Sequence, residues 1–218
     1  MPLKRAVLPL LDHIEPLAAE VGAANTVVFA AGRRHGHNTD VPGMLAALAE
    51  RGVTRASLPP TPAVLILGAG ATACSALAAL RALGITHATV AARAPTRATD
   101  LLATADRLRL KITLTPFDAR HDPPDPPDLL MSTVPAGAAD RYAEQIAART
   151  FLPPRVLDIV YHPWPTPLTT AARQAGAAVT DGFDLLLHQA AGQFQLMTGR
   201  SAPLEPMRAA GLAALEAR

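Results

Sequence analysis

The chain has 218 residues, half of them apolar, which is enough for one large domain or two small ones with a substantial core. Its 20 basic and 18 acidic residues leave a net charge of only +2, which argues against a strongly basic nucleic-acid-binding surface. No run approaches the ~18 apolar residues of a membrane span, and the first residues lack a cleavable signal pattern. We therefore expect a folded, cytoplasmic protein that binds neither nucleic acid nor membrane.

The N-terminal residues predict short helices and a hairpin. Apolar residues between positions 6 and 14 recur at helical spacing, which predicts one amphipathic helix. Further elements are expected at residues 16–21 (helix), 24–29 (strand), 33–37 (a return strand after Gly32) and 41–48 (helix).

Val64-Leu-Ile-Leu67 is the start of the most informative stretch. Four apolar residues without a polar break predict a strand buried on both faces, and an Ala- and Leu-rich helical pattern follows at once. The turn between them consists of Gly68, Ala69, Gly70, Ala71, Thr72 and Ala73. Two glycines and a small third residue at this spacing let a pyrophosphate approach the backbone at a helix N-terminus. The turn favours nucleotide binding, although a tightly packed strand-to-helix turn also needs small residues.

The remaining chain alternates strands with helices. Strands are expected at residues 88–92, 112–114, 129–133, 156–160 and 177–179, and helices at 96–108, 138–148 and 166–175. From residue 184 the pattern is helical, with a break at 199–203. This order predicts an α/β fold with a doubly wound, parallel Rossmann-type sheet.

The end of the second strand of this unit selects the nucleotide. NAD-binding units place a carboxylate there for the ribose 2′-OH, whereas this chain has Arg93 and Arg97 and no acidic residue before Asp100. Two guanidinium groups suit a 2′-phosphate, so we expect NADP (NADPH) as the cofactor. The alternative is that both arginines are solvated cations at a helix start.

Other reactive residues carry weaker signals. The single cysteine, Cys74, cannot form an internal disulfide and, on the first helical turn, is expected to be a small packed side chain rather than a reactive thiol. His35, His37 and His162 show no ligand spacing with Cys or carboxylates, so no metal site is expected.

Several motifs together resemble the shikimate dehydrogenase family. They are Ala24-Asn-Thr-Val27, Gly36-His-Asn-Thr-Asp-Val-Pro-Gly43, the glycine turn, Asp158-Ile-Val-Tyr-His-Pro-Trp-Pro-Thr-Pro-Leu168 and Asp181-Gly-Phe-Asp-Leu-Leu-Leu-His-Gln-Ala190. The resemblance runs through essentially the whole chain. It implies NADP-dependent, reversible reduction of 3-dehydroshikimate to shikimate on the route to chorismate and the aromatic amino acids.

The resemblance also implies roles for individual residues. Lys4 corresponds to the catalytic lysine and Asp40 to its partner, whereas by pattern alone they would be an N-terminal cation and a helix cap. Asn25 and Gln189 match positions that bind substrate hydroxyls, and Tyr161 matches an active-site tyrosine. Further cofactor-binding positions are Thr133, Val134, Ile159 and Gly182, the last against the nicotinamide.

Two departures from the family leave alternatives open. The family has Asn-Arg-Thr where this chain has Ala92-Arg93-Ala94, and it has an additional substrate-binding segment before the lysine motif. We expect residues 1–40 and 183–218 to form an incomplete αβ substrate lobe and residues 41–182 the NADP-binding domain. The alternatives are a nucleotide-binding fragment without turnover and a quinate/shikimate dehydrogenase relative that tolerates NAD.

Overall fold

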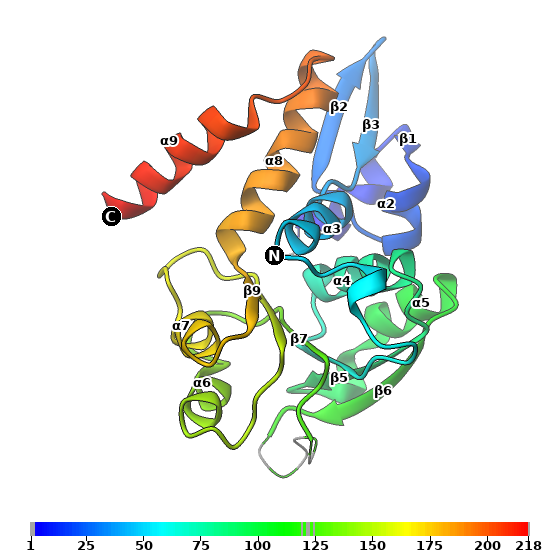
Figure 1. Ribbon diagram of the computed structural model, residues 1–218. Coiled ribbons are helices and arrows are strands. Elements are labelled where there is room, and N and C mark those ends of the chain that lie inside the picture. The colour runs from blue at the N-terminus through cyan, green and yellow to red at the C-terminus, as the bar shows by residue number, and fades with distance from the viewer. Residues whose placement is uncertain (1–2, 119, 121–122, 124, 218) are drawn as a thin grey trace.

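The computed structural model describes residues 3–118, 120, 123 and 125–217, arranged as a large sheet with helices on both faces and a smaller sheet beside its carboxyl edge (Figure 1). The strands of the large sheet are β4 (Val64–Leu67), β5 (His87–Ala92), β6 (Lys111–Pro116), β7 (Leu129–Ser132), β8 (Arg155–Asp158) and β9 (Ala178–Thr180). Their order is β6-β5-β4-β7-β8-β9, and every neighbouring pair is parallel. The predicted doubly wound Rossmann-type sheet is confirmed.

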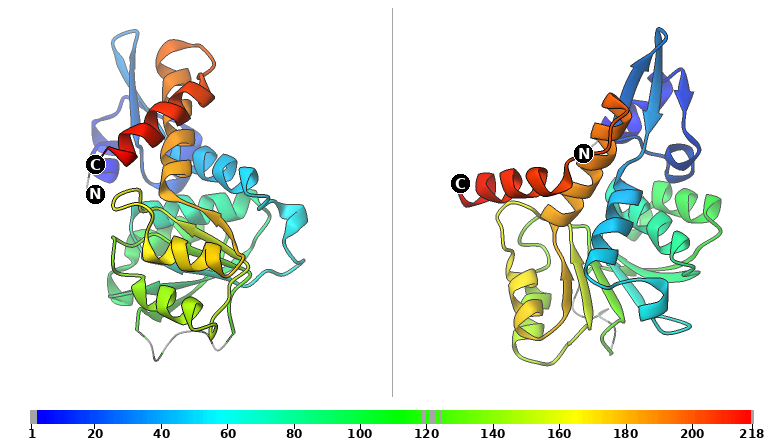
Figure 2. Two further views of the ribbon diagram at one scale, coloured as in Figure 1. Left: turned by 60° about the vertical axis from the view of Figure 1, so that its left-hand side comes forward. Right: turned by 45° about the horizontal axis from the view of Figure 1, so that its top comes forward.

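Strand β4 lies at the centre of this sheet, and both of its faces are covered. Val64 and Ile66 belong to one apolar core, and Leu65 and Leu67 to the core on the opposite face. The helices that cover the faces are α4 (Ala71–Ala82), α5 (Thr99–Arg107), α6 (Asp140–Ala147) and α7 (Pro167–Gln174). Figure 2 shows α4 and α5 on one side of the strands and α6 and α7 on the other. The unbroken apolar run in β4 follows from this double burial.

The smaller sheet has three strands in the order β1-β3-β2. The elements of this part are α1 (Leu3–Ala6), η1 (Leu8–Leu10), β1 (His13–Ile14), α2 (Pro16–Val21), β2 (Thr26–Ala30) and β3 (Arg33–His37). Strands β2 and β3 form the expected hairpin, with Ala31 and Gly32 as a two-residue turn and positive φ at both. That conformation matches the twist of paired strands.

Two predicted helices were wrong in extent. Residues 6–14 do not form one helix: the chain passes from α1 through η1 into β1, which pairs in parallel with β3. Pro9 lacks the N–H that a continuing helix needs, and pairing with β3 uses the backbone that follows. Residues 96–108 are likewise divided into η3 (Pro95–Arg97) and α5, because Ala98 has non-helical backbone angles.

The two parts of the molecule are joined by packing as well as by chain connections. Helix α2 ends at Gly22, and its last carbonyl groups accept hydrogen bonds from side chains of α5: Thr104 Oγ1 donates to Val21 O at 2.9 Å and Arg107 Nε to Glu20 O at 2.9 Å. These bonds satisfy acceptors that a helix end would otherwise leave unpaired. The small sheet is therefore held in place relative to the large one.

Helix α8 (Gly182–Thr198) runs from the edge of the large sheet past β2 and crosses α3 (Asp40–Glu50) (Figure 1). A Cβ at Gly43 would come within 2.7 Å of the Gln189 backbone nitrogen, so the absence of a side chain permits this close crossing. Arg51 pairs with the buried Asp184 at 2.9–3.0 Å, and Arg208 of α9 (Leu204–Glu216) pairs with Glu50. No helix within the described ranges is long and apolar enough to cross a membrane.

Candidate functional site

The glycine turn lies between β4 and α4, at the point where the sheet order reverses from β4 to β7. Gly68 has φ +100°, a conformation that side-chain-bearing residues rarely adopt, and a Cβ there would lie 2.8 Å from Thr133 Oγ1. Thr133 Oγ1 donates a hydrogen bond to Leu67 O at 2.7 Å, which fixes the two strand ends together. Ligands of doubly wound sheets bind at this switch point.

Gly70 differs from Gly68 because it faces open space. No protein atom lies within 4 Å of the position that a Cβ would take, and the backbone angles are ones that other residues also adopt. The small residue therefore serves neither packing nor backbone conformation within the protein. It leaves the start of α4 accessible to a group outside the chain, as a pyrophosphate requires.

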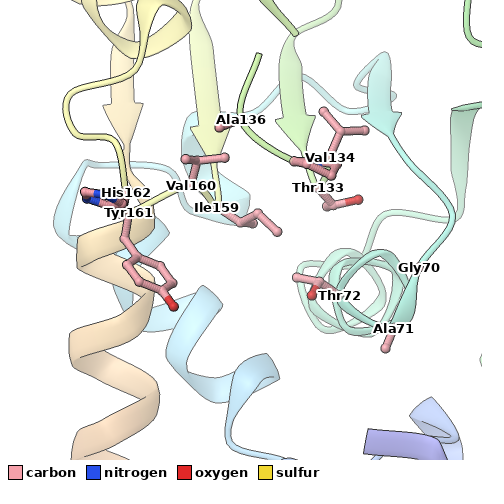
Figure 3. A pocket seen from close by; sticks show the side chains of 11 residues that line it. Gly70, Ala71, Thr72, Thr133, Val134, Ala136, Ile159, Val160, Tyr161 and His162 are labelled. Atoms are coloured by element: carbon pink, nitrogen blue, oxygen red, sulfur yellow. The ribbon is translucent and has the colours of Figure 1, made fainter. Parts of the chain in front are cut away.

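A groove of about 570 Å³ begins at this turn. Its walls are residues 70–72, 133–136 and 159–162. In Figure 3, Thr72 at the start of α4 and Thr133 and Ile159 beyond the ends of β7 and β8 border the same space. These residues, with Val134 and Ala71, are predicted cofactor positions, and the fold brings them together.

The groove continues past Gly68, Ala69 and Gly70 into a second region lined by Arg93 and Phe117. Arg93 is exposed and follows β5, where the sequence predicts the group that selects the nucleotide. Among the described residues that line this region, none carries a carboxylate. The side chain of Arg97 lies outside the described part of the chain. The region suits a phosphate-bearing ribose better than one with a free 2′-OH.

Lys4 and Asp40 lie in contact although 36 positions separate them. Lys4 Nζ is 2.5 Å from Asp40 Oδ2, and the two side chains are only 18% and 7% exposed. Helix α1 supplies the lysine, and Asp40 is the first residue of α3, where a carboxylate is favoured by the helix dipole. Partial burial strengthens the attraction between the opposite charges.

Asn25 fixes the second oxygen of this carboxylate. Its Nδ2 donates to Asp40 Oδ1 at 2.8 Å and to Thr39 Oγ1 at 2.8 Å. Its Oδ1 accepts from Thr39 N at 2.8 Å and Thr26 Oγ1 at 3.0 Å. The amide orientation is set by these partners, so the Lys4–Asp40 pair is held on both sides.

A second cavity of about 280 Å³ lies beside these polar groups. Gln189 of α8 lines it, with Oε1 3.4 Å from Asn25 Nδ2 and Nε2 donating to Leu186 O at 3.0 Å. Tyr161, 45% exposed, stands where this cavity meets the groove, and Thr72 and Ile159 line both. The polar cluster and the glycine turn therefore open onto one continuous space.

Gly182 marks the closest approach of α8 to the strand ends. A Cβ there would lie 2.4 Å from Ile159 O, so no side chain fits without moving the backbone. The preceding Asp181 caps the helix by accepting from Phe183 N and Asp184 N at 3.1 Å. Gly182 lines the small cavity and adds no side chain to that wall.

Asp158 anchors the loop that carries Ile159 and Tyr161. Its side chain accepts hydrogen bonds from Thr166 Oγ1 at 2.8 Å and Val160 N at 3.3 Å. Burial raises the pKa of the Asp158 carboxyl above its ordinary value, although these two donors favour the charged form. The residue is structural: it joins both ends of the loop at residues 158–166.

Two polar residues of the site are not among those predicted from the sequence. Thr39 binds both polar ends of the Asn25 side chain, and Gln193 lines the small cavity one helical turn after Gln189. The i, i+4 spacing of the two glutamines places them on the same face of a helix, so this spacing could have predicted that Gln193 lines the same cavity as Gln189. The contacts of Thr39 depend on the hairpin that brings Asn25 to it.

The fold and the site define the class of the protein: a two-lobed, Rossmann-type nucleotide-binding protein whose cofactor groove leads to a lysine–aspartate pair in a small polar cavity.

Comparison with known proteins identifies the family within this class. Residues 182–210 match the family described as Shikimate 5'-dehydrogenase C-terminal domain. Shikimate dehydrogenase (NADP(+)) of Moorella thermoacetica is 37% identical over 218 residues, covering 95% of this chain and 70% of that protein. The chain therefore belongs to the shikimate dehydrogenase family.

Solved structures of the same family resemble this chain along most of its length. Shikimate 5-dehydrogenase from Thermus thermophilus, in complex with NADP(H) and shikimate, has a TM-score of 0.76 and 33% identity over 99% of this chain and 77% of that one. Quinate dehydrogenase from Corynebacterium glutamicum, in complex with NAD, has a TM-score of 0.82 and 30% identity over 97% and 75%. The family predicted from the sequence motifs is confirmed.

Proposed function

We propose that this chain is an NADP-dependent oxidoreductase that reversibly reduces 3-dehydroshikimate to shikimate. The observation that carries the proposal is the placement of Lys4 and Asp40, 2.5 Å apart, in a cavity continuous with the groove at the glycine turn. A dehydrogenase needs a proton-transferring group within reach of the carbon that exchanges hydride with the cofactor, and the two parts of the site supply this arrangement.

The groove fits a dinucleotide phosphate. The backbone at Gly70 is open for a pyrophosphate, the start of α4 offers free N–H groups, and Arg93 lies where a 2′-phosphate would be bound. Thr133, Val134, Ile159 and Gly182 would line the nicotinamide end. When bound, the cofactor supplies or accepts the hydride.

Residues of the small cavity would perform the proton chemistry. Lys4 donates a proton to the carbonyl oxygen of the substrate during reduction and takes it back during oxidation. Asp40 orients the ammonium group, and Asn25 holds Asp40 through its second oxygen. Gln189 and Tyr161, which line the cavity, would hydrogen-bond substrate hydroxyl groups, and Asn25 Nδ2 also donates toward Gln189 Oε1.

We also propose the division of labour between the lobes that the sequence suggests, with residues 1–40 and 183–218 on the substrate side and residues 41–182 on the cofactor side. The polar cluster draws on both segments of the substrate side, because Asp40 is the last residue of the first segment and Gln189 lies on α8 in the second.

The test is a pair of measurements on the 218-residue protein. Shikimate-dependent reduction of NADP⁺ should be observed spectrophotometrically, and NADPH binding should be measured separately by fluorescence. Turnover supports the proposal. NADPH binding without any shikimate oxidation would instead support the nucleotide-binding fragment.

A second candidate is a quinate/shikimate dehydrogenase that uses NAD. Two observations favour this candidate. The chain is similar to a quinate dehydrogenase in complex with NAD, and Arg93 is flanked by the small residues Ala92 and Ala94. The same assay with quinate and NAD⁺ separates the candidates. The NADP proposal requires that kcat/KM be higher with shikimate and NADP⁺ than with quinate and NAD⁺.

A further inference from the structure

The small sheet gathers two histidines and a glutamate on one face, and none of the three lines the cavities of the proposed active site. His13 of β1 and His35 of β3 are direct partners in the parallel ladder, and their rings lie 5.5 Å apart between centroids. Glu15 stands two positions after His13 and so on the same face. One nitrogen or oxygen atom from each of the three side chains lies within 4.8 Å of the other two.

We propose that His13, Glu15 and His35 form a binding site for a divalent transition-metal ion of the Zn²⁺ type, with the fourth position open to water. Two imidazoles and one carboxylate are a donor set that zinc accepts. Neighbouring ligand atoms of a tetrahedral zinc lie about 3.3 Å apart when the bonds are about 2.0–2.1 Å. His13 Nε2 and Glu15 Oε1 are already 3.2 Å apart.

The backbone around the cluster is fixed, which favours a site of defined shape. Asp12 N donates to Arg34 O at 3.0 Å and Glu15 N to Gly36 O at 2.9 Å, so β1 is tied to β3 on both sides of His13. The third ligand atom, within 4.8 Å of the other two, would move closer by rotation of its side chain. His13 and Glu15 side chains are 53% and 38% exposed, which gives a metal ion a path of entry.

Two arginines precede His35 on β3, and Arg33, on the same face as His35, is exposed, so that water and salt screen its charge. Arg34, the cation next to His35 along β3, is already paired with Asp12 through bonds of 2.8–3.0 Å. The carboxylate of Glu15 contributes the negative charge of the ligand set. Soft and borderline metals that accept imidazole would be preferred over Mg²⁺, which requires oxygen ligands.

The proposed metal site lies between the two chain segments that carry Lys4 and Asp40. The segment that contains His13 begins with α1, which carries Lys4, and β3 leads directly to Asp40. A metal ion that bridges β1 and β3 would therefore cross-link the two segments that form the proposed catalytic pair. Metal binding would stabilise the small sheet, because the folded arrangement of ligands exists only in the native state.

The experiment is a titration of the metal-free protein with ZnCl₂, followed by calorimetry and by the melting temperature, with Co²⁺ as a spectroscopic probe. We expect one ion per chain, a higher melting temperature with Zn²⁺ but not with Mg²⁺, and intense visible Co²⁺ bands typical of tetrahedral nitrogen and oxygen ligation. Zn²⁺ binding should weaken as the pH falls, because protons compete with the metal ion for the imidazole ligands.

Three variants make the test specific. His13→Ala and Glu15→Gln should each weaken Zn²⁺ binding by at least about 10- to 100-fold, the loss that even outer-shell partners cause. His37→Ala is the matched control, since His37 lies on the same strand but outside the cluster, and should bind Zn²⁺ like the parent protein. Equal Zn²⁺ affinity in His13→Ala and the parent, or an equal loss in His37→Ala, would overturn the proposal.

Discussion

The cofactor side and the substrate side of the site are built by different means. The glycine turn is contiguous in sequence, and its function depends on backbone shape: a positive φ at Gly68 and open space at Gly70. The polar cluster joins side chains from α1, the residue before β2, α3 and α8, and Asn25 and Gln189 are 164 positions apart. Substitutions should therefore act through shape on the cofactor side and through charge and hydrogen bonding on the substrate side.

A substitution on the substrate side should cause the greatest loss of activity. Lys4→Ala should lower kcat by about 10²- to 10⁴-fold, the usual contribution of a positioned proton donor. NADPH affinity should be unchanged, because Lys4 does not line the groove at the glycine turn. Steady-state kinetics in both directions and NADPH fluorescence titration measure the two quantities.

Lys111→Ala is the matched control, because Lys111 is the only other lysine in the sequence and lies at the exposed start of β6. It should keep the kinetics of the parent protein. If Lys4→Ala retained turnover within a few-fold of the parent, Lys4 would have no role in proton transfer.

On the cofactor side, Gly70→Ala should weaken NADPH binding while leaving the fold intact. The added methyl group meets no protein atom, but it occupies space proposed for the pyrophosphate. Overpacking costs about 1–3 kcal/mol, which corresponds to about 5- to 150-fold in affinity. Fluorescence titration and thermal melting measure the two effects.

Gly182→Ala is the contrasting variant, because Gly182, unlike Gly70, is packed against protein atoms. Its Cβ would lie 2.4 Å from Ile159 O, so this variant should lower the melting temperature, whereas Gly70→Ala should not. Tight NADPH binding by a well-folded Gly70→Ala protein would show that the pyrophosphate does not approach this backbone.

A smaller effect is expected at the nucleotide-selecting corner. Arg93→Ala should weaken NADPH binding by roughly tenfold and leave NADH binding unchanged, because only the former carries a 2′-phosphate and the exposed site is screened by water. Arg200→Ala removes the same charge from an exposed position elsewhere and should affect neither. Equal losses for both nucleotides in Arg93→Ala would assign Arg93 a general electrostatic role.

The two sides also differ in how far sequence predicts them. The turn at residues 68–73 could be predicted because glycine spacing and an apolar strand are local signals, and the parallel sheet followed from alternation of elements. From spacing alone, nothing linked Lys4, Asn25 and Gln189; the family resemblance suggested these residues, and the three-dimensional contacts came only with the fold. The helix predicted at residues 6–14 failed for the same reason: pairing of His13 and Ile14 with β3 outweighed local periodicity.

The smallest expected effect concerns Asp158, which lies where β8 ends and the site loop begins. Burial raises the pKa of its carboxyl in the folded state, so the folded protein holds this proton more tightly than the unfolded chain does. The stabilisation from Asp158 is then fully present below the ordinary pKa of 3.8 and is lost as the pH rises through the higher folded-state pKa. Asp158→Asn cannot ionise and retains an acceptor for Thr166 or Val160.

The melting temperature of Asp158→Asn should therefore rise relative to that of the parent protein as the pH rises above 3.8. This change in stability should be smaller than the changes in activity and NADPH affinity predicted for the other variants. Thermal melts of both proteins across this pH range measure the difference. Thr166→Val provides the complementary change, because it removes a donor that favours the charged carboxylate of Asp158. The melting temperature of this variant should fall more steeply than that of the parent protein as the pH rises. A melting-temperature difference between parent and Asp158→Asn that does not vary with pH would mean that Asp158 ionises in the folded protein as readily as in the unfolded chain.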